Sequence, residues 1–567
     1  MTASNTAAPA SQTAINSDLA SAKHCLEQAQ SAVNKALGSI KSLCSTSGEF
    51  DNAIMDDYQL ASYDLAFCTA ELSAADIMLN YASEAGEQDS LAPETSLAFI
   101  AEALHSVYSR LISRAAELKL SRKDLLQAFG EDSLNQLLER YLNGSAVAAL
   151  GEAIMQRSHA RLPSLLDEEK EMVREAFSRF GDDVVAPLAE EIHRKDLDIP
   201  DSILKPAAEL GCFGTSIPER FGGLMPDDRT DSLGMIVVTE ELSRASLGAA
   251  GSLITRPEIA AKALLSGGTD AQQQHWLPRL ASGETLCAIS ITEPNFGSDV
   301  ASISLKATPT DGGWLLNGSK TWCTFAGKAN LLLTLARSNP DPKLGHKGLS
   351  LFLVEKPSDT GHEFSHQQAS GGKLSGKAIS TIGYRGMHSF DLFFEDYFVP
   401  ADNLIGGKDG EGKAFYYTMA GFSGGRIQTA ARATGVMQAA FERALSYAGE
   451  RKVFGKAIGE YQLTRVKLGR MLATLTASRQ FSYQVARMMD DGKGQMEASL
   501  VKLFSCRAAE WVAREAMQIH GGMGYAEESA VSRYFIDARV LSIFEGAEET
   551  LALKVIAKDL VKRAQPC

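Results

Sequence analysis

Near the N-terminus, hydrophobic residues recur every three or four positions, which is the spacing of one face of a helix. They are Leu19, Ala22, Leu26, Ala29, Val33, Ala36, Ile40 and Leu43. The pattern also predicts helices over 51–84, from Pro93 to Leu118, and over 121–157. Because each apolar stripe needs a partner, we expect residues 1–160 to form an N-terminal bundle of four helices. No group of His, Asp and Glu stands out in it, which favours packing or oligomerisation over chemistry.

The pattern of the remaining chain changes twice. Residues 165–285 are again helical in pattern, whereas 286–400 consist of β-rich runs broken by Gly, Pro and Asn, as in a domain built from hairpins. Long helical patterns return over 401–567. Within the β domain, the Gly-rich stretch 369–377 is expected to be a surface loop. The predicted fold class is α+β, mainly α, with a helical domain, a β domain and a C-terminal helical bundle domain following the N-terminal bundle.

Composition excludes several classes of partner. The 567 residues carry a formal net charge of −14, and phosphate binding needs a basic face, so nucleic acid is not expected as the main partner. No run of about 20 apolar residues predicts a membrane span. The N-terminal residues lack the charge and apolar core of a secretory signal. The eight cysteines are scattered without a CxxC pair, so we expect neither a metal site nor disulfides, and a reducing cytoplasm fits.

Two common nucleotide-binding motifs are absent from the sequence, which has neither GxGxxG after a strand nor GxxxxGK[ST]. A dinucleotide would therefore have to be held in another way. The β domain offers hydroxyl and backbone donors in Thr292 and in the turn at 297–299. On a second predicted strand, Trp322 and Thr324 supply a flat apolar wall and another hydroxyl.

Five segments stand in the order and spacing of one enzyme family: ITEPNFGSD (291–299), LNGSKTWCT (316–324), ERKVFGKAI (450–458), QIHGGMGY (518–525) and IFEG (543–546). Over about 165–567 the chain therefore resembles the acyl-CoA dehydrogenase family. The resemblance implies a helical domain, a β domain and a four-helix bundle, an acyl-CoA substrate, and FAD held between the β domain and the C-terminal helices. It further implies electron-transferring flavoprotein as the electron acceptor, and a homodimer or dimer of dimers that shares the cofactor.

The resemblance assigns the cofactor contacts residue by residue. Thr292 and Thr324 would hydrogen-bond the flavin ring, and Trp322 would flank it. Further FAD contacts expected on the same basis are Ile291, Ser298, Arg451, Phe454, Gln462, Gln518, Gly521 and Gly522. Arg451, Phe454 and Gln462 would reach FAD bound in a neighbouring subunit. The guanidinium group of Arg451 suits that position because it matches phosphate oxygens.

The same resemblance identifies Glu545 as the base that removes the proton next to the thioester. Phe544 and Gly546 flank it, which favours a desolvated carboxylate. Some relatives carry their base on an earlier helix, at the position of Gly425, and glycine cannot abstract a proton. The chain departs from the family shortly after the base. Ala547 and Glu549 stand where Thr and Gln usually contact FAD, so cofactor contacts at this point are in doubt.

For the substrate, the resemblance indicates contacts from Ser298, Phe422, Arg426, Arg256 and Gly546. Across its whole length the chain is most similar to a family member that acts on a short branched dicarboxylyl-CoA, whose free carboxylate needs a cation because an unpaired buried charge is very costly. Arg256 is our candidate for that cation, with Arg385 and His388 in reserve.

Three alternatives stay open. The chain could be an acyl-CoA oxidase that passes electrons to oxygen, or a dehydrogenase for a monocarboxylic short-chain or branched-chain thioester. A third alternative is a catalytically inactive binding protein on the same fold, which the presence of Glu545 disfavours.

Overall fold

The computed structural model describes residues 12–46 and 49–566, which divide into two compact units. The first, here called the helical unit, comprises the described residues within Met1–Glu168, Val436–Met488 and Gly494–Cys567. The second, the sheet unit, comprises Glu169–Gly435 and Met489–Lys493. Helix α14 (Ala414–Glu450) runs through the boundary between them. The N-terminal helices and the C-terminal helices therefore belong to the same compact unit.

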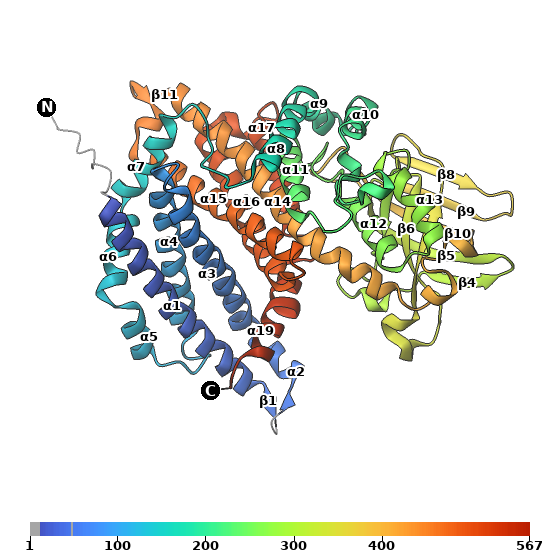
Figure 1. The fold of residues 1–567 in the computed structure, drawn as a ribbon, viewed down its shortest axis with the longest axis horizontal. Coiled ribbons are helices and arrows are strands. Elements are labelled where there is room, and N and C mark those ends of the chain that lie inside the picture. The colour runs from blue at the N-terminus through green and yellow to red at the C-terminus, as the bar shows by residue number, and fades with distance from the viewer. Residues whose placement is uncertain (1–11, 47–48, 567) are drawn as a thin grey trace. The chain divides into compact units, whose positions relative to one another are not determined.

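The helical unit begins with helices from the N-terminal part of the chain. They are α1 (Gln12–Leu43), α2 (Asn52–Met55), α3 (Gln59–Ala85), α4 (Leu91–Arg114), α5 (Arg122–Phe129), α6 (Asp132–Tyr141) and α7 (Gly144–Met155). A short hairpin, β1 (Ser45–Thr46) with β2 (Glu49–Phe50), follows α1. Figure 1 shows α1, α3 and α4 as long helices lying side by side. The predicted N-terminal helical region is therefore present.

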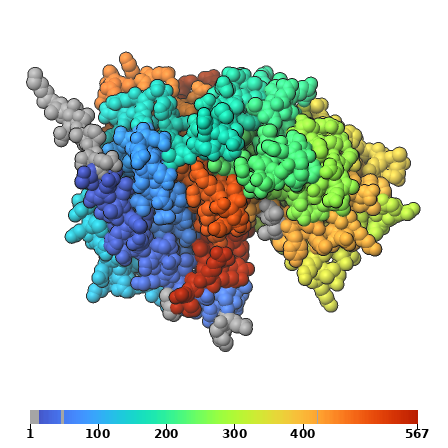
Figure 2. Space-filling view, viewed as in Figure 1, coloured from blue at the N-terminus to red at the C-terminus, as the bar shows by residue number. Residues whose placement is uncertain are grey.

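The C-terminal part of the helical unit holds α15 (Gln462–Asp490), α16 (Gln495–His520), α17 (Ala530–Leu541), α18 (Glu548–Thr550), the wide-turn segment η11 (Leu551–Ala557) and α19 (Lys558–Arg563). In Figure 2 the blue N-terminal helices abut the red end of the chain. At this contact Lys41 Nζ donates to the carbonyl oxygens of Lys562 and Ala564 at 2.8 and 2.6 Å. The N-terminal helices thus pack against the C-terminal helices.

The single helix predicted over 121–157 is wrong, because this stretch forms three short helices. Ser121 begins α5 by accepting a hydrogen bond from the Asp124 N–H, and Gly130 ends that helix. Asn143 begins α7 by accepting from two backbone N–H groups in the next turn. Short polar side chains that cap helices divide a helical pattern even when the apolar spacing continues.

The sheet unit combines helices with one sheet. Its helices are α8 (Glu168–Phe180), α9 (Ala186–Lys195), α10 (Asp201–Glu209), α11 (Ser232–Ala245), α12 (Thr255–Gly267) and α13 (Asp270–Ala281). Its strands are β3 (Cys287–Ser290), β4 (Lys306–Thr310), β5 (Gly313–Thr324), β6 (Leu331–Arg337), β7 (Leu349–Glu355), β8 (Glu363–Gln367), β9 (Lys373–Ala378) and β10 (Ser389–Pro400). They pair in the order β3-β6-β4-β5-β10-β9-β8, and β7 pairs with β6. The mainly helical α+β class is confirmed.

Strand β6 shows where the core of the sheet unit lies. Leu331, Leu333 and Leu335 pack with residues of α12 and α13. Leu332 and Ala336 point the other way and pack with residues of β5 and β10. Successive side chains of a strand alternate between faces, so β6 is buried on both. The sheet therefore has an apolar core on each face.

The surface loop expected over 369–377 is a second wrong prediction. Most of this stretch belongs to β9, which pairs with β8 and β10. Gly376 lies opposite Phe364 and Leu392, and a Cβ atom added to it would meet the Phe364 ring at 2.4 Å. This glycine makes room for a neighbouring aromatic ring inside the sheet.

None of the helices within the described residues has the length and apolarity needed to cross a bilayer.

Candidate active site

The predicted flavin contact Thr292 lies in a tight turn that follows strand β3. Glu293 and Phe296 exchange two backbone hydrogen bonds of 3.0 Å across this turn. The Thr292 carbonyl accepts a hydrogen bond of 2.9 Å from the N–H of Thr321 on β5. The side chain of Ser298 is exposed, whereas that of Ile291 is buried. The turn is therefore tied to the strand that carries Trp322 and Thr324.

A buried ion pair holds this turn against β5. Lys320 Nζ lies 2.9 Å from Glu293 Oε1 and donates to the Ile291 carbonyl at 2.8 Å. Glu293 also accepts hydrogen bonds from the N–H groups of Ser304 and Leu305, at 2.7 and 2.8 Å. Burial lowers the pKa of Lys320 to about 8, although Glu293 acts in the opposite direction. The pair fixes the backbone on both sides of the predicted flavin-contact threonine.

Trp322 lies at a β-bulge. The register between β5 and β10 shifts by one residue, so that Thr321 and Trp322 both oppose Asp391. Trp322 has a φ of 56° and its side chain is 55% exposed. Bulges re-aim side chains and are common beside active sites, where an unusual φ must be held by its surroundings. Here Thr321 Oγ1 donates to Asp391 Oδ1 at 2.5 Å, and the indole offers a large apolar surface.

Thr324 lies at the end of β5, opposite the start of β10. Its hydroxyl lies 2.9 Å from the Ser389 hydroxyl. The next residue, Phe325, has a φ of 71° and donates its N–H to the His388 carbonyl at 2.7 Å. A hydroxyl group can donate one hydrogen bond while accepting others. Thr324 therefore keeps the capacity to hydrogen-bond the polar edge of a ring.

A cluster behind this strand end could be mistaken for a metal site. Potential ligand atoms of Asp196, His362 and His388 lie within 4.8 Å of one another. However, His388 Nδ1 lies 3.1 Å from Asp198 and Nε2 lies 3.0 Å from Asp196. Burial alone would lower the pKa of His388, but the two carboxylates raise it above its ordinary value. Both ring nitrogens of His388 are thus engaged by carboxylates, and the cluster acts as an ionic clamp rather than a metal site.

In the helical unit, a small hairpin follows α14. Arg451 directly precedes this hairpin, and Phe454 lies in its turn. Strands β11 (Lys452–Val453) and β12 (Lys456–Ala457) are joined by Phe454 and Gly455, whose φ angles are 50° and 89°. Positive φ at both central residues is typical of a type I′ turn. Arg451 is exposed, as is Gln462 at the start of α15, and Phe454 is 94% exposed. The hairpin therefore presents an exposed aromatic ring and an exposed guanidinium group close together in the chain.

The glycine turn after α16 leaves open space. Gly521 has a φ of 57° and donates its N–H to the carbonyl of Gln518, whose side chain is exposed. A Cβ atom added to Gly521 or Gly522 would have no described protein atom within 4 Å. At Gly522, a side chain would therefore not collide with any described part of this chain. The absence of a side chain instead suits the close approach of a ligand.

The predicted base Glu545 lies in the loop between α17 and α18. It is half-buried and has a φ of 53°, and Gly546 after it has a φ of 99°. Lys502 on α16 is 1% exposed, and its Nζ donates to the Gly546 carbonyl at 2.6 Å. The Glu548 N–H donates to the Ser542 carbonyl at 3.0 Å and closes the loop. A left-handed conformation at a glutamate persists only where surrounding contacts hold it.

The predicted substrate arginine Arg256 is buried on α12, at 7% exposure. Its Nη1 donates to the Ser252 carbonyl at 3.2 Å, and among the described residues no carboxylate forms an ion pair with it. Arg432, which the sequence did not single out, donates to the hydroxyl of the same serine at 2.9 Å. Arg426 is half-buried on α14, and the side chain of Phe422 lies outside the described residues. The guanidinium groups of Arg256 and Arg432 therefore both donate to Ser252.

The reserve cations are engaged elsewhere. Arg385 donates to the carbonyls of Thr381 and His193, each at 3.0 Å, and lies 3.4 Å from Asp196. His388 is held between its two aspartates. Both reserve residues thus anchor the connection between α9 and α10, which leaves Arg256 as the candidate for a substrate carboxylate.

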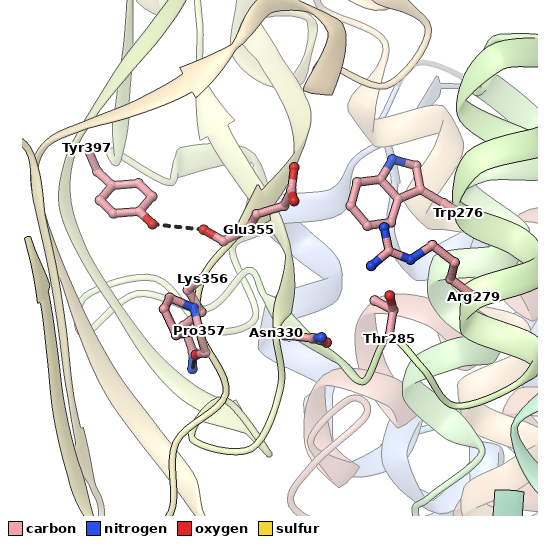
Figure 3. Close-up of a pocket in the computed structure, with 8 residues that line it drawn as sticks. All are labelled: Trp276, Arg279, Thr285, Asn330, Glu355, Lys356, Pro357 and Tyr397. Carbon is pink, nitrogen blue, oxygen red and sulfur yellow. Dashed lines mark hydrogen bonds between the residues drawn. The ribbon is translucent and has the colours of Figure 1, made fainter. Parts of the chain in front are cut away.

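A cavity of about 300 Å³ in the sheet unit is a separate feature (Figure 3). It is lined by Trp276, Arg279, Thr285, Asn330, Glu355, Lys356, Pro357 and Tyr397. The Tyr397 hydroxyl donates to the Glu355 carbonyl at 2.8 Å, and Lys356 Nζ donates to the carbonyls of Gly327 and Pro357. None of the predicted site residues lines this cavity, so it is not the candidate active site.

Comparison with known proteins identifies the family. Residues 167–284, 288–397 and 412–561 match the N-terminal, middle and C-terminal domains of acyl-CoA dehydrogenase. The chain is also 37% identical over 551 residues to (2S)-methylsuccinyl-CoA dehydrogenase of Cereibacter sphaeroides, covering 95% of this chain and 97% of that protein. The chain belongs to the acyl-CoA dehydrogenase family.

Other acyl-CoA dehydrogenases match a smaller part of the chain. Isovaleryl-CoA dehydrogenase of Arabidopsis thaliana is 35% identical and covers 74% of this chain and 98% of its own. Butyryl-CoA dehydrogenase from Megasphaera elsdenii has a TM-score of 0.63 at 30% identity, covering 70% of this chain and 99% of its own. A structure of the electron transferring flavoprotein of Acidaminococcus fermentans includes a chain with a TM-score of 0.61 at 28% identity, covering 70% of this chain and 98% of its own. The predicted acyl-CoA dehydrogenase fold is confirmed.

Acyl-CoA dehydrogenases are FAD enzymes, so FAD is the cofactor of this chain. The residues present fit that group. The sheet unit supplies an exposed indole and two hydroxyl groups, from Trp322, Thr292 and Thr324. The helical unit supplies the exposed guanidinium group of Arg451 and the open glycine turn. Taken separately, the sheet unit offers an apolar surface and partners for a polar ring edge, and the helical unit offers a phosphate-matching cation and side-chain-free backbone, each of which suits a flavin dinucleotide.

Some candidate residues of this acyl-CoA dehydrogenase could not be found from sequence. Lys320 and Glu293 are 27 positions apart, and no local pattern pairs them. Lys502 stands in an otherwise ordinary helix, 44 positions before the carbonyl that it contacts. A lysine within a run of apolar residues was the only signal, and it does not say which group the lysine meets.

Proposed function

We propose that this acyl-CoA dehydrogenase oxidises (2S)-methylsuccinyl-CoA, a short branched dicarboxylyl-CoA thioester, to mesaconyl-CoA. The observation that carries this proposal is the similarity to (2S)-methylsuccinyl-CoA dehydrogenase over 95% of the chain, including the N-terminal helices. The similarity to isovaleryl-CoA dehydrogenase covers 74%. A relative that shares the additional N-terminal segment is the better guide to the substrate.

Glu545 removes the proton from the carbon next to the thioester carbonyl. Its carboxylate gains this proton, while the substrate's β carbon loses a hydride, and a double bond forms between the two carbons. Bound FAD would supply the acceptor for this hydride and its two electrons. The half-buried position of Glu545 limits its hydration, and contacts from Lys502 and Ser542 hold its loop. A base fixed in this way needs little reorganisation before proton transfer.

Arg256 binds the free carboxylate of the acyl group. Its guanidinium group is buried, and the described residues give it no carboxylate partner, so a substrate carboxylate would complete an ion pair there. A planar guanidinium group also suits a carboxylate geometrically. A monocarboxylic acyl group would leave this charge buried and unpaired.

Electron-transferring flavoprotein is the electron acceptor, and the enzyme is at least a homodimer. The structural match within the Acidaminococcus fermentans flavoprotein structure supports the acceptor. The exposed ring of Phe454 beside the exposed Arg451 supports a shared cofactor site, because a partner chain or its FAD would remove that ring from water.

The decisive experiment is a substrate screen. We expect methylsuccinyl-CoA to bleach the flavin absorbance under anaerobic conditions faster than isobutyryl-CoA or butyryl-CoA. A faster reaction with butyryl-CoA would show that the substrate assignment is wrong while leaving the family unchanged. Peroxide formation in air without an added acceptor would instead indicate an oxidase.

The base is tested separately by Glu545→Gln. The variant retains the side-chain shape but cannot accept the proton, so we expect flavin reduction to slow by at least about 100-fold. FAD content and acyl-CoA binding should stay unchanged. Near-normal reduction would remove Glu545 from the mechanism.

A further inference from the structure

The N-terminal helices reach the residues that directly follow the loop of Glu545. The Tyr63 hydroxyl on α3 donates to Glu548 Oε1 at 2.5 Å. Glu548 is the first residue of α18 and is 7% exposed. Tyr63 precedes residue 167, where the family match begins, so the contact comes from the segment outside the matched domains. Both residues belong to the helical unit.

Arg507 on α16 completes this contact. Its Nε lies 3.0 Å from Glu548 Oε2, and its Nη2 contacts Glu548 Oε1 as well. Nη2 also donates to the Tyr63 hydroxyl at 2.8 Å. The guanidinium group lies over the ring of Phe67, one turn further along α3, at 5.4 Å. Helix α3 thus supplies a hydroxyl and an aromatic face to one ion pair.

The charges at this site depend on one another. Burial alone would raise the pKa of Glu548, but Arg507 and Tyr63 hold it below its ordinary value. Burial and the Glu548 carboxylate raise the pKa of Tyr63 to about 12, which keeps its hydroxyl protonated as a donor. Tyr63 and Arg507 therefore favour the ionised form of Glu548 and hold its carboxylate in one orientation.

Fixing Glu548 also fixes the loop before it. Its N–H closes the loop onto Ser542, so the side chain and the backbone of one residue join α3 and α16 to the segment 542–548. A second contact from the N-terminal helices lies further along the same helical run. Asp56, just before α3, lies 2.5 Å from Lys554 in η11. The N-terminal segment therefore holds the run that starts directly after the base loop at two points.

We infer that the N-terminal helical segment positions the catalytic base, with Tyr63 acting through Glu548 and Arg507. The inference rests on the proposed function, since it takes Glu545 as the base. Glu545 keeps its left-handed backbone only while the contacts around the loop persist. Loss of the Tyr63 hydroxyl leaves Glu548 with one donor fewer and lets the loop populate other conformations.

The test is the rate of flavin reduction by methylsuccinyl-CoA in anaerobic single-turnover measurements on the full-length FAD enzyme. Tyr63→Phe should lower this rate about tenfold, because small displacements of a reacting group are costly. FAD content and the apparent Kd for methylsuccinyl-CoA should not change. Glu548→Gln, which keeps the shape and weakens the pairing with Arg507, should give a similar decrease and serves as the second variant.

Tyr81→Phe is the matched control. Tyr81 also lies on α3, and its hydroxyl donates to the Pro163 carbonyl at 2.8 Å, away from the base loop. It should leave the reduction rate within about twofold of the unmodified enzyme. An equal loss in both tyrosine variants would show that α3 contributes only general stability and would overturn the inference.

A double-mutant cycle separates positioning from stability. In the Glu545→Gln enzyme, Tyr63→Phe should have less than about a twofold further effect, because the loop then carries no base to position. The same decrease in both backgrounds would overturn the role of Tyr63 and leave the base assignment intact. Near-normal reduction by Glu545→Gln alone would overturn the base assignment, and with it the positioning role.

Discussion

The two units hold their candidate site segments by different means. In the sheet unit, the turn of Thr292 is held by Lys320, which is fully buried, and by Glu293, which is almost fully buried. In the helical unit, the loop of Glu545 is held by Lys502 and by the Glu548–Arg507 pair, whose arginine is 54% exposed. Buried ion pairs are costly to break, whereas exposed ones add little stability. Breaking the sheet-unit pair should therefore cost more folding stability than losing the exposed Arg507 contact, and we expect the helical-unit contacts chiefly to set position.

The source of the contacts differs as well. The Lys320–Glu293 pair lies entirely within the matched middle domain. Tyr63, by contrast, lies before the matched domains, and it reaches a residue 485 positions away. Residues outside the matched domains thus contribute to the base loop. The comparison suggests that a segment can be added to an enzyme fold and act on its chemistry without containing catalytic groups.

Lys320→Met gives the largest effect that the comparison predicts. The substitution leaves Glu293 buried without its cation, and breaking a buried pair in this way costs roughly 3–5 kcal/mol. We expect the free energy of unfolding to fall by about this amount in denaturant titrations, together with a loss of bound FAD. A double variant, Lys320→Met with Glu293→Gln, is the control, because it removes the unpaired charge. Equal stability of the single variant and the unmodified protein would contradict the first half of the comparison.

Lys502→Met should act mainly on rate. Methionine fills a similar volume but cannot donate to the Gly546 carbonyl, so the base loop loses one anchor. We expect flavin reduction to slow about tenfold, while the free energy of unfolding falls by only about 1–2 kcal/mol. Stopped-flow reduction and denaturant titration of the same preparation measure the two quantities. A large loss of stability with an unchanged rate per bound FAD would reverse the assignment of Lys502.

Sequence reasoning succeeded where the relevant residues are neighbours in the chain. The helical and β regions follow from local spacing of apolar residues and from Gly, Pro and Asn breaks. The same local signals caused the errors. Gly376 suggested a loop but instead accommodates the Phe364 ring within the sheet, and Asn143 divided a helix whose apolar spacing continued.

The contacts that hold the candidate site could not be predicted from the sequence, for a different reason. Tyr63 and Glu548 meet only because α3 packs against the C-terminal helices. Nothing in the sequence around either residue indicates that this tyrosine and this glutamate are in contact. Burial is equally hard to predict at Arg256, because nothing in the sequence around it indicates the 7% exposure observed. Long-range pairing and burial depend on the whole fold, and local spacing does not encode them.

The smallest effect that the comparison predicts is a pH dependence of the sheet unit. His388 faces Asp196 and Asp198, with the His362 ring 4.4 Å away and Arg385 beside Asp196, and the two carboxylates raise its pKa. Because its pKa is higher in the folded state, the imidazolium contributes its full stabilisation below the ordinary histidine pKa and loses it as pH rises through the raised value. Thermal melts across this range should therefore show the difference in stability between the unmodified protein and His388→Gln shrinking as pH increases. A difference that stays constant with pH would mean that His388 is neutral in the fold and that its contacts with Asp196 and Asp198 are hydrogen bonds without an ion pair.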